Sequence, residues 1–367
     1  MLGLDRDVIV GPVVLGDDMG TDTREAFLAA GITLVDEGPI QVTTNPRLGT
    51  HVRWMHTPTM GVDWIIGRLP PTVRLLTRTI TGMQDRMASY VCLAVNAELW
   101  RWIRMSANQR ASQWVRDLTP VPLVRNHAII VGTGEVGSAI ARTLRPQFTR
   151  ITGVSRSGTA KPDFDVVYPL SVETNSEDNR TGDSRPGDSR PGTMITGVSR
   201  SGAEPGFGVV YPVSVETDSE DNRAGDERAG TQTTLLDSTS SIPWGQADAV
   251  VVTLPLTLET RGILGGDQLS QLSGAHLILV GRGATVDFDA LKTALDVGTV
   301  RHATLDVFPI EPLPPESWLW SHPRVTLTPH ICGLSDPTDT LTSFLHARDS
   351  LLAGQIPRAL VDLKRGY

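Results

Sequence analysis

A glycine-rich loop between a short apolar run and a helical stretch constrains the fold of this 367-residue chain most strongly. Residues 128–131 are all apolar, and Gly132-Thr-Gly-Glu-Val-Gly137 follows them with the G-x-G-x-x-G spacing. After a strand, the first glycine allows a tight turn, the second lets backbone approach a pyrophosphate, and the third lets helix and strand pack closely. The free N–H groups of the next helix face the phosphates. The loop therefore predicts a dinucleotide site made of Gly132, Thr133, Gly134, Glu135, Val136 and Gly137.

Short apolar runs recur along the rest of the chain, at 249–254, 276–280, 303–306 and 325–328. Helical stretches, such as 288–295, separate most of them. Continuous Val/Ile/Leu strands between helices are typical of a parallel sheet that is covered on both faces. We therefore predict a doubly wound α/β domain of the Rossmann type. The proline-free stretch 83–118 has apolar residues at helical spacing, and we expect it to bridge two domains.

Composition and charge limit the partners. The net charge of −8 argues against nucleic acid. No apolar run approaches the length of a membrane span, and the N-terminus does not resemble a signal peptide. The two cysteines, Cys92 and Cys332, fit no metal-binding spacing. We expect a cytoplasmic protein of 40% hydrophobic residues without a bound metal, and with no membrane or nucleic-acid partner.

A segment in the middle of the chain is duplicated. Residues 151–180 resemble residues 195–223, and both copies begin Ile-Thr-Gly-Val-Ser-Arg-Ser-Gly. Two copies are too few for a solenoid, so we expect one copy to fill the sheet and the other to be extruded. The polar stretch 173–192 is rich in Gly, Pro, Asp and Ser, which predicts a disordered surface loop.

Each copy ends its apolar run with Ser-Arg-Ser. A site for NAD usually has an acid here for the ribose 2′-hydroxyl, whereas Arg156 between Ser155 and Ser157 suits a 2′-phosphate. NADP(H) is therefore preferred, with NAD(H) as the alternative. Arg200 offers the same chemistry in the second copy. The first copy is favoured because a short connection joins it to the preceding helix.

A cation, carboxylates and an imidazole follow in order downstream. Arg282 lies in Val280-Gly-Arg-Gly283, Asp306 and Glu311 lie close together, and His330 follows Thr328-Pro329. A guanidinium can hold the carboxylate of a 2-oxo acid bidentately. As hydride reaches the carbonyl carbon, the oxygen needs a proton, which a histidine held by a carboxylate can donate. The set predicts reduction of a 2-oxo acid with a nicotinamide.

These motifs together resemble the D-isomer-specific 2-hydroxyacid dehydrogenases, and most closely their glyoxylate/hydroxypyruvate reductase A group. The similarity is carried by residues 311–317, 319–320, 322–325, 328–330 and 365–367, and by residues 254–257 and 260–262. The resemblance implies two α/β domains with the active site in the cleft. The smaller, flavodoxin-like substrate domain would comprise residues 1–98 and 331–367, and the cofactor domain residues 99–330.

The same resemblance implies roles for individual residues. Arg282 would grip the substrate carboxylate, His330 would be the acid/base, and Glu311 would raise its pKa. Backbone amides at Met60 and Gly61 would form a second carboxylate clamp. The remaining cofactor contacts would be Leu254, Pro255, Val280, Gly281 and Asp306. The family is typically a homodimer formed through the cofactor domain.

Some features depart from the family pattern. Met60 stands where a small residue is frequent, and the first fifty residues are expected to be short of one strand–helix unit. Trp100, Trp102 and Trp114 are expected to pack in a core or a domain interface. The leading hypothesis is reduction of glyoxylate or hydroxypyruvate. Reduction of a larger 2-oxo acid and a non-catalytic NAD(P)-binding sensor or partner-binding protein are the alternatives.

Overall fold

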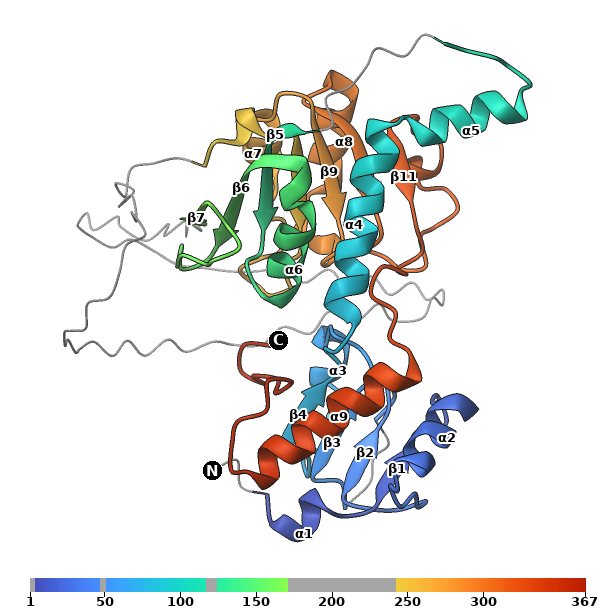
Figure 1. Cartoon of the computed structure of the whole chain (residues 1–367), viewed down its shortest axis with the longest axis vertical. Helices are drawn as coiled ribbons and strands as arrows, with labels where there is room; N and C mark the ends of the chain where they lie inside the picture. Colours follow the sequence, from blue (N-terminus) through green and yellow to red (C-terminus); the bar gives the residue numbers. More distant parts are fainter. Residues whose placement is uncertain (1–3, 47–50, 117–123, 171–241) are drawn as a thin grey trace, which may run out of the picture. The chain divides into compact units, whose positions relative to one another are not determined.

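The computed structural model describes residues 4–46, 51–116, 124–170 and 242–367 (Figure 1). They belong to a unit formed by Met1–Val172 and Ser241–Tyr367, which is compact by itself. The second copy of the duplicated segment, with Arg200, and the loop predicted at 173–192 lie outside the described residues.

The larger sheet has seven parallel strands in the order β11-β10-β9-β8-β5-β6-β7. Strand order reverses between the neighbours β5 and β8, which is where doubly wound sheets bind their ligands. The bounds are β5 (Arg125–Val131), β6 (Phe148–Ser155), β7 (Val166–Pro169), β8 (Ala249–Val252), β9 (Ala275–Leu279), β10 (Val300–Leu305) and β11 (Val325–Leu327). The doubly wound prediction is confirmed.

The first copy of the duplicated segment supplies strands β6 and β7. A short turn at Arg145–Gln147 joins β6 to the preceding helix α6 (Glu135–Leu144). Val131 of β5 pairs with Val154 of β6, so the ends of the two strands are adjacent. The short connection that favoured this copy is therefore present in the structure.

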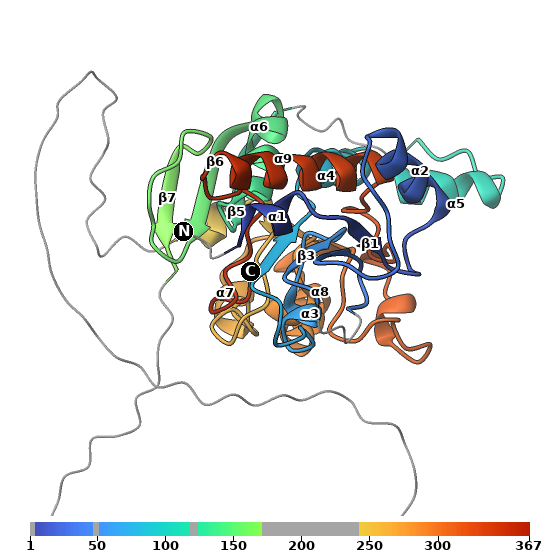
Figure 2. The same ribbon diagram turned by 90° about the horizontal axis from the view of Figure 1, so that it is seen from below.

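Apolar side chains fill both faces of this sheet. Within β5, Ile129 and Val131 belong to one core cluster, and Ala128 and Ile130 belong to the other. Figure 2 shows α4 (Met83–Leu99) and α6 on one side of the sheet, with α7 (Gly266–Ser270) and α8 (Phe288–Val297) on the other. Continuous apolar strands form here because both faces are covered.

The smaller sheet is parallel with the order β1-β2-β3-β4. Its strands are β1 (Val13–Leu15), β2 (Ile40–Val42), β3 (Trp54–Thr57) and β4 (Leu75–Arg78). Phe27 of α2 (Thr21–Ala29) and Phe344 of α9 (Pro337–Leu352) pack in the core cluster on one face of this sheet. The short helices α1 (Arg6–Ile9) and α3 (Asp63–Ile66) complete this part of the chain.

The first fifty residues contain more of the expected unit than the sequence suggested. Leu34 forms a parallel bridge with Val13, and Val13 N donates to the Thr33 carbonyl oxygen at 2.9 Å. Counting this bridge as a reduced strand gives the order 2-1-3-4-5 that is typical of flavodoxin-like sheets. The predicted absence of a strand is wrong, whereas no helix occurs between residues 35 and 54 where the structure describes the chain.

The predicted long helix is broken. It ends at Leu99, Arg101 has a left-handed φ of 51°, and α5 (Trp102–Arg110) begins after it. No residue of α5 is buried, and Trp100, Trp102 and Trp114 are 60%, 66% and 90% exposed. The prediction that these tryptophans pack in a core is wrong for the single chain, because no described residue covers this side of α5.

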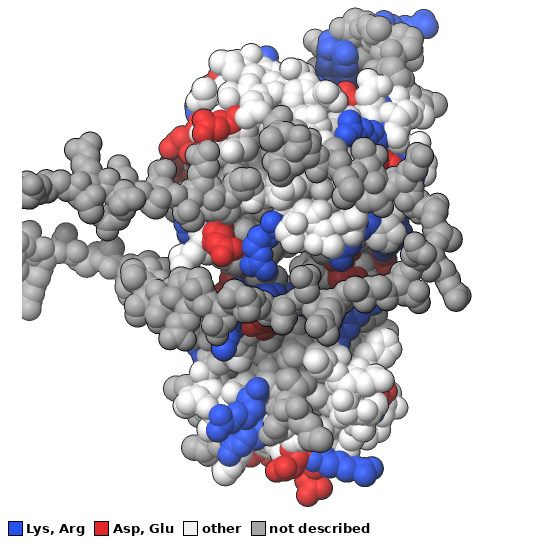
Figure 3. All heavy atoms as spheres, turned by 90° about the vertical axis from the view of Figure 1, so that its left-hand side faces the viewer, with Lys and Arg blue, Asp and Glu red and all other residues white. Residues whose placement is uncertain are grey.

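Two further observations concern the charge on the surface and the length of the apolar helices. On the face drawn in Figure 3, acidic and basic side chains form small separate groups of both signs. Within the described ranges, no helix combines the length and the apolar character that crossing a bilayer requires.

Candidate active site

The glycine loop lies at the carboxyl end of β5. Gly132 has a φ of 110°, and a Cβ on Gly137 would lie 1.9 Å from the Gly132 carbonyl oxygen, so both positions require glycine. A Cβ on Gly134 would meet nothing within 4 Å. Packing therefore does not explain this second glycine of the motif, whereas the approach of a pyrophosphate would. Helix α6 begins at Glu135 without a side-chain cap, so its first N–H groups are available to an anion.

Two further loops meet the glycine loop at the same edge of the sheet. A Cβ on Gly281 would lie 2.6 Å from the Leu254 carbonyl oxygen, and Gly281 N donates to Val252 O at 3.0 Å. Thr253 Oγ1 donates to the Gly132 carbonyl oxygen at 3.2 Å. The loops after β5, β8 and β9 thus converge where the strand order reverses. Two more predicted residues belong to these loops, Pro255 and Val280.

The Ser-Arg-Ser sequence lies at the end of β6. The Arg156 side chain is 59% exposed, and its Nη1 is 3.7 Å from Glu259 Oε2. Ser155 Oγ accepts from Gly158 N at 3.2 Å, and Ser157 Oγ lies 2.7 Å from Thr159 Oγ1. Among the residues that the structure describes, only a loose, exposed ion pair holds the guanidinium, and a phosphate could displace it.

Glu135 has a partner that the sequence did not suggest. Its carboxylate forms an ion pair with Arg358 at the surface. The pair offsets a negative charge that would otherwise face the phosphates at the start of α6.

Arg282 lies against the loop that follows β3. Its Nε donates to Asp63 Oδ1 at 2.8 Å, and its Nη1 donates to the Gly281 carbonyl oxygen at 2.9 Å. A Cβ on Gly61 would lie 1.1 Å from Arg282 Nη2, so only glycine allows the guanidinium to lie here. The structure thus brings Gly61 and Arg282 together and adds Asp63 as the group that orients the guanidinium.

Side chains hold the carbonyl groups of this loop. Arg78 Nη1 donates to the Met60 carbonyl oxygen at 3.1 Å, and Thr59 Oγ1 and Trp64 Nε1 donate to that of Gly61 at 2.9 and 3.0 Å. No described residue accepts from the amide groups of Met60 and Gly61. They are therefore free of protein acceptors among the described residues, and their predicted role as a carboxylate clamp stays a prediction.

His330 and Glu311 form a close pair. His330 Nδ1 lies 2.7 Å from Glu311 Oε2, and Glu311 Oε1 accepts from Phe308 N at 2.8 Å. The hydrogen bond with Glu311 raises the pKa of His330, although burial opposes it. Burial acts to raise the pKa of Glu311, but the hydrogen bonds from His330 and Phe308 outweigh it and lower that pKa. His330 Nε2 has no partner among the described residues, so it can donate a proton to a ligand.

The turn that carries His330 is fixed by a buried carboxylate. Asp306 is fully buried and accepts from Thr328 Oγ1, Ile331 N and Cys332 N at 2.6, 2.9 and 3.0 Å. His330 N donates to the Asp306 carbonyl oxygen at 2.9 Å, and His330 has a left-handed φ of 55°. Asp306 therefore positions the imidazole. Its predicted contact with the nicotinamide stays a prediction.

Two further groups lie near this turn, of which Tyr90 was not identified from the sequence. Tyr90 of α4 places its hydroxyl 2.6 Å from Thr328 Oγ1, and burial raises the pKa of Tyr90 to about 12. Cys332 is buried, and burial is the main cause that raises the pKa of its thiol. Its thiol is therefore poorly reactive. No sequence motif marks Tyr90, because helical spacing alone does not separate it from its neighbours.

His56, close to the Met60 loop in sequence, has a structural role. It is fully buried, its Nδ1 lies 2.8 Å from Thr77 Oγ1, and burial lowers the pKa of His56 to about 3. His302 and His322 have partners in Thr326 and Asp296. None of these three histidines belongs to the candidate site.

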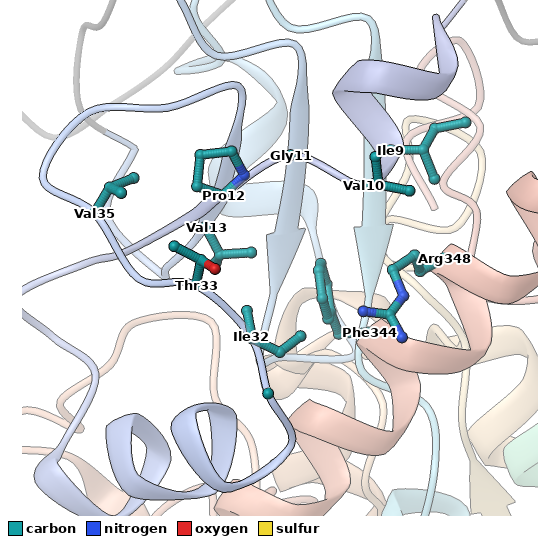
Figure 4. A pocket seen from close by; sticks show the side chains of 11 residues that line it. Ile9, Val10, Gly11, Pro12, Val13, Ile32, Thr33, Val35, Phe344 and Arg348 are labelled. Atoms are coloured by element: carbon teal, nitrogen blue, oxygen red, sulfur yellow. The ribbon is translucent and has the colours of Figure 1, made fainter.

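A cavity beside the smaller sheet also lies away from the candidate site. It has a volume of about 280 Å³ and is lined mainly by apolar residues of the smaller sheet region, with Phe344 and Arg348 of α9 (Figure 4). It contains none of the residues predicted for the site. Within the described ranges, no cluster of side chains is suited to bind a metal.

Comparisons with known proteins give a family match and a relative of similar length. The family model for the D-isomer specific 2-hydroxyacid dehydrogenase NAD binding domain matches residues 215–332. A Streptomyces coelicolor protein, described as an uncharacterized protein in the mprR 3′ region, is 31% identical over 325 residues, which are 86% of this chain and 90% of that protein.

Solved structures share the fold. A D-isomer specific 2-hydroxyacid dehydrogenase from Xanthobacter autotrophicus, in complex with NADPH and MES, has a TM-score of 0.70 at 23% identity, covering 97% of this chain and 99% of that one. An NADPH-dependent glyoxylate/hydroxypyruvate reductase from Sinorhizobium meliloti, in complex with NADP and sulfate, has a TM-score of 0.67 at 22% identity with the same coverage.

Proposed function

Since the chain belongs to the D-isomer specific 2-hydroxyacid dehydrogenase family, we propose that it is an NADPH-dependent reductase of small 2-oxo acids such as glyoxylate and hydroxypyruvate. The observation that carries the proposal is the His330–Glu311 pair, with a free Nε2, in a chain whose Arg282 lies against Gly61. A family member without catalysis would not need this pair, which argues against a sensor or partner-binding protein.

Each of these residues has a separate role in the proposed reaction. Arg282 Nη2 and the amides of Met60 and Gly61 bind the substrate carboxylate and so fix the neighbouring carbonyl group. His330 Nε2 donates its proton to the carbonyl oxygen, and Glu311 stabilises the charged imidazole before the transfer. A bound NADPH supplies the hydride for the carbonyl carbon. In the reverse direction the neutral imidazole accepts the proton of the hydroxyl.

Arg156 supports the preference for NADPH. Arg156→Glu is expected to lower kcat/KM with NADPH roughly 10- to 100-fold, because a charged hydrogen bond to the 2′-phosphate is lost. The rate with NADH should change little. Steady-state kinetics with both cofactors gives the ratio of kcat/KM for NADPH to kcat/KM for NADH. Glu259→Gln is the matched control: it removes the acid 3.7 Å from Arg156 and should strengthen NADPH binding. Equal losses with NADH and NADPH would contradict this role.

The His330–Glu311 pair predicts the pH dependence. Reduction needs the charged imidazole, and the pKa of His330 is raised, so kcat for reduction should fall only as pH rises through a value above the ordinary 6.5. Oxidation of the hydroxy acid needs the neutral imidazole and should rise over the same range. In Glu311→Gln, the fall in kcat for reduction should occur at lower pH. The dependence of kcat on pH, measured in both directions, tests this prediction. If the pH at which kcat changes is the same in Glu311→Gln as in the wild-type protein, the His330–Glu311 pair does not cause the change.

A larger 2-oxo acid is the second candidate. It is kept because Met60 departs from the small residue that is frequent in the family, so the substrate pocket differs from the family pattern. The two candidates share one reaction and differ only in kcat/KM across a set of acids of increasing size.

Homodimer formation and a cytoplasmic location are also part of the proposal. The exposed apolar residues Trp100, Trp102 and Ile103 support self-association, since exposed aromatic clusters are typical of interfaces. Both cysteines are free, as in a reducing compartment.

Product analysis tests the proposed reaction. Incubation of the protein with hydroxypyruvate and NADPH should yield D-glycerate and NADP⁺ in equal amounts. Cofactor binding without formation of any 2-hydroxy acid, from any 2-oxo acid, would contradict it.

A further inference from the structure

A second arginine beside the carboxylate clamp lacks a charge partner. Arg78 ends strand β4, and its Nη1 donates to the Met60 carbonyl oxygen at 3.1 Å. Its Nε is buried without a hydrogen-bond partner. Across the residues that the structure describes, no carboxylate lies within ion-pair distance of Arg78.

Two of the three basic groups around the clamp have an ion-pair partner. Asp63 pairs with Arg282 at 2.8 Å, and Glu311 pairs with His330 at 2.7 Å. Arg78 is the third basic group near this loop, and the third acid, Asp306, accepts from Thr328 Oγ1 and two backbone amides and not from an arginine. Burial, and then the charge of Arg282, lower the pKa of Arg78, so the two guanidinium groups are near enough to repel.

An arginine cannot relieve this cost by losing its proton. Its guanidinium stays charged in proteins, whereas a buried lysine or histidine can become neutral. Buried charges are normally paired, because an unpaired one is costly. A monocarboxylate substrate would be bound by Arg282 and the loop amides and would leave Arg78 unpaired. A substrate with a second anionic group would satisfy it.

We propose that Arg78 and Arg282 are two cationic subsites for one substrate, a 2-oxo acid that carries a second carboxylate. The inference rests on the proposed reaction and specifies its substrate class. A carboxylate is the smallest group that matches a guanidinium fork bidentately. Hydride from the reduced nicotinamide forms the new C–H bond, the C=O π bond breaks, and the oxygen takes the proton of His330. The products are a 2-hydroxy dicarboxylate and the oxidised nicotinamide.

Acids with equal carbon number test this inference. With NADPH, kcat/KM should be higher for oxaloacetate than for 2-oxobutanoate. Arg78→Met should lower the value for oxaloacetate roughly 30- to 1000-fold more than the value for 2-oxobutanoate, because both acids lose the support of the Met60 loop but only the dianion loses a charge partner. Arg78→Lys keeps the charge and should recover part of the preference. Arg24→Met removes an exposed charge from the same half of the chain and should change neither value.

The change in selectivity separates a subsite from a structural role. If Arg78 only holds the Met60 carbonyl, Arg78→Met will lower both values by the same factor, and the inference is overturned. Equal values for the two acids in the wild-type protein would overturn it too.

Binding of unreactive acids makes the test independent of turnover. In calorimetry with NADP⁺ present, succinate should bind more tightly than butanoate, and Arg78→Met should remove the difference. If no 2-oxo acid is reduced but this difference is found, the proposed function fails and the dianion site stands. If no acid is reduced and succinate has no advantage, both fail.

Discussion

His330→Asn is expected to lower kcat for reduction roughly 10²- to 10⁴-fold, the range of a lost general acid. Asparagine is the suitable replacement because His330 has a φ of 55°, and asparagine tolerates left-handed backbone better than most residues. The backbone hydrogen bond from residue 330 to Asp306 should therefore survive. Steady-state kinetics gives the loss, and titration of NADPH by fluorescence shows whether the cofactor site is intact.

Three outcomes are informative for this variant. A fall in kcat with unchanged cofactor binding supports His330 as the proton donor. A fall of less than about 10-fold would contradict that role, since even modest general acids contribute more. The fall in kcat with rising pH that we assign to His330 should also be absent from the residual activity of the variant. If it persists, another group donates the proton.

Arg282→Lys is expected to lower kcat/KM roughly 30- to 1000-fold, although the positive charge is kept. Lysine has no planar fork, so it cannot bind Asp63 through one nitrogen and a substrate carboxylate through another. The loss should be found with every 2-oxo acid, because all of them carry the carboxylate that Arg282 binds. Kinetics with glyoxylate, the smallest of these acids, measures the effect without a contribution from the rest of the substrate.

A control variant removes the partner of Arg282. Asp63→Asn keeps a side chain that can accept a hydrogen bond from Arg282 Nε but loses the charge. Its effect should be smaller than that of Arg282→Lys, because the fork remains. An Arg282→Lys enzyme with wild-type kcat/KM would show that Arg282 does not bind the substrate.

Residue patterns predicted the larger sheet well because its strands are continuous apolar runs. Within β5, alternate residues from Ala128 to Val131 belong to two different core clusters, and both clusters consist of apolar side chains. The smaller sheet was harder to predict. Its strands β1 and β2 have only three residues each, and the strand at Leu34 is a single bridge. Pairing of such short strands depends on the helices packed against them, which local sequence does not specify.

The candidate site was predictable where the chemistry dictates the residue type. A cation, a carboxylate and an imidazole are needed for the reaction, and their order along the chain pointed to Arg282, Glu311 and His330. Asp63 and Tyr90 support this set across 219 and 238 residues of chain. Such contacts arise only when distant segments pack together. The exposed tryptophans were mispredicted for the same reason. A sequence shows that a residue is apolar, but it does not show which other residues cover it.

The oxidation of NADPH in the presence of glyoxylate and hydroxypyruvate tests the central claim most directly. The measurement follows the absorbance of the reduced nicotinamide and compares wild-type protein with His330→Asn. We predict turnover by the wild-type protein, faster with NADPH than with NADH, and loss of nearly all of it in the variant. Folded wild-type protein that binds NADPH but oxidises it with no 2-oxo acid would contradict the account.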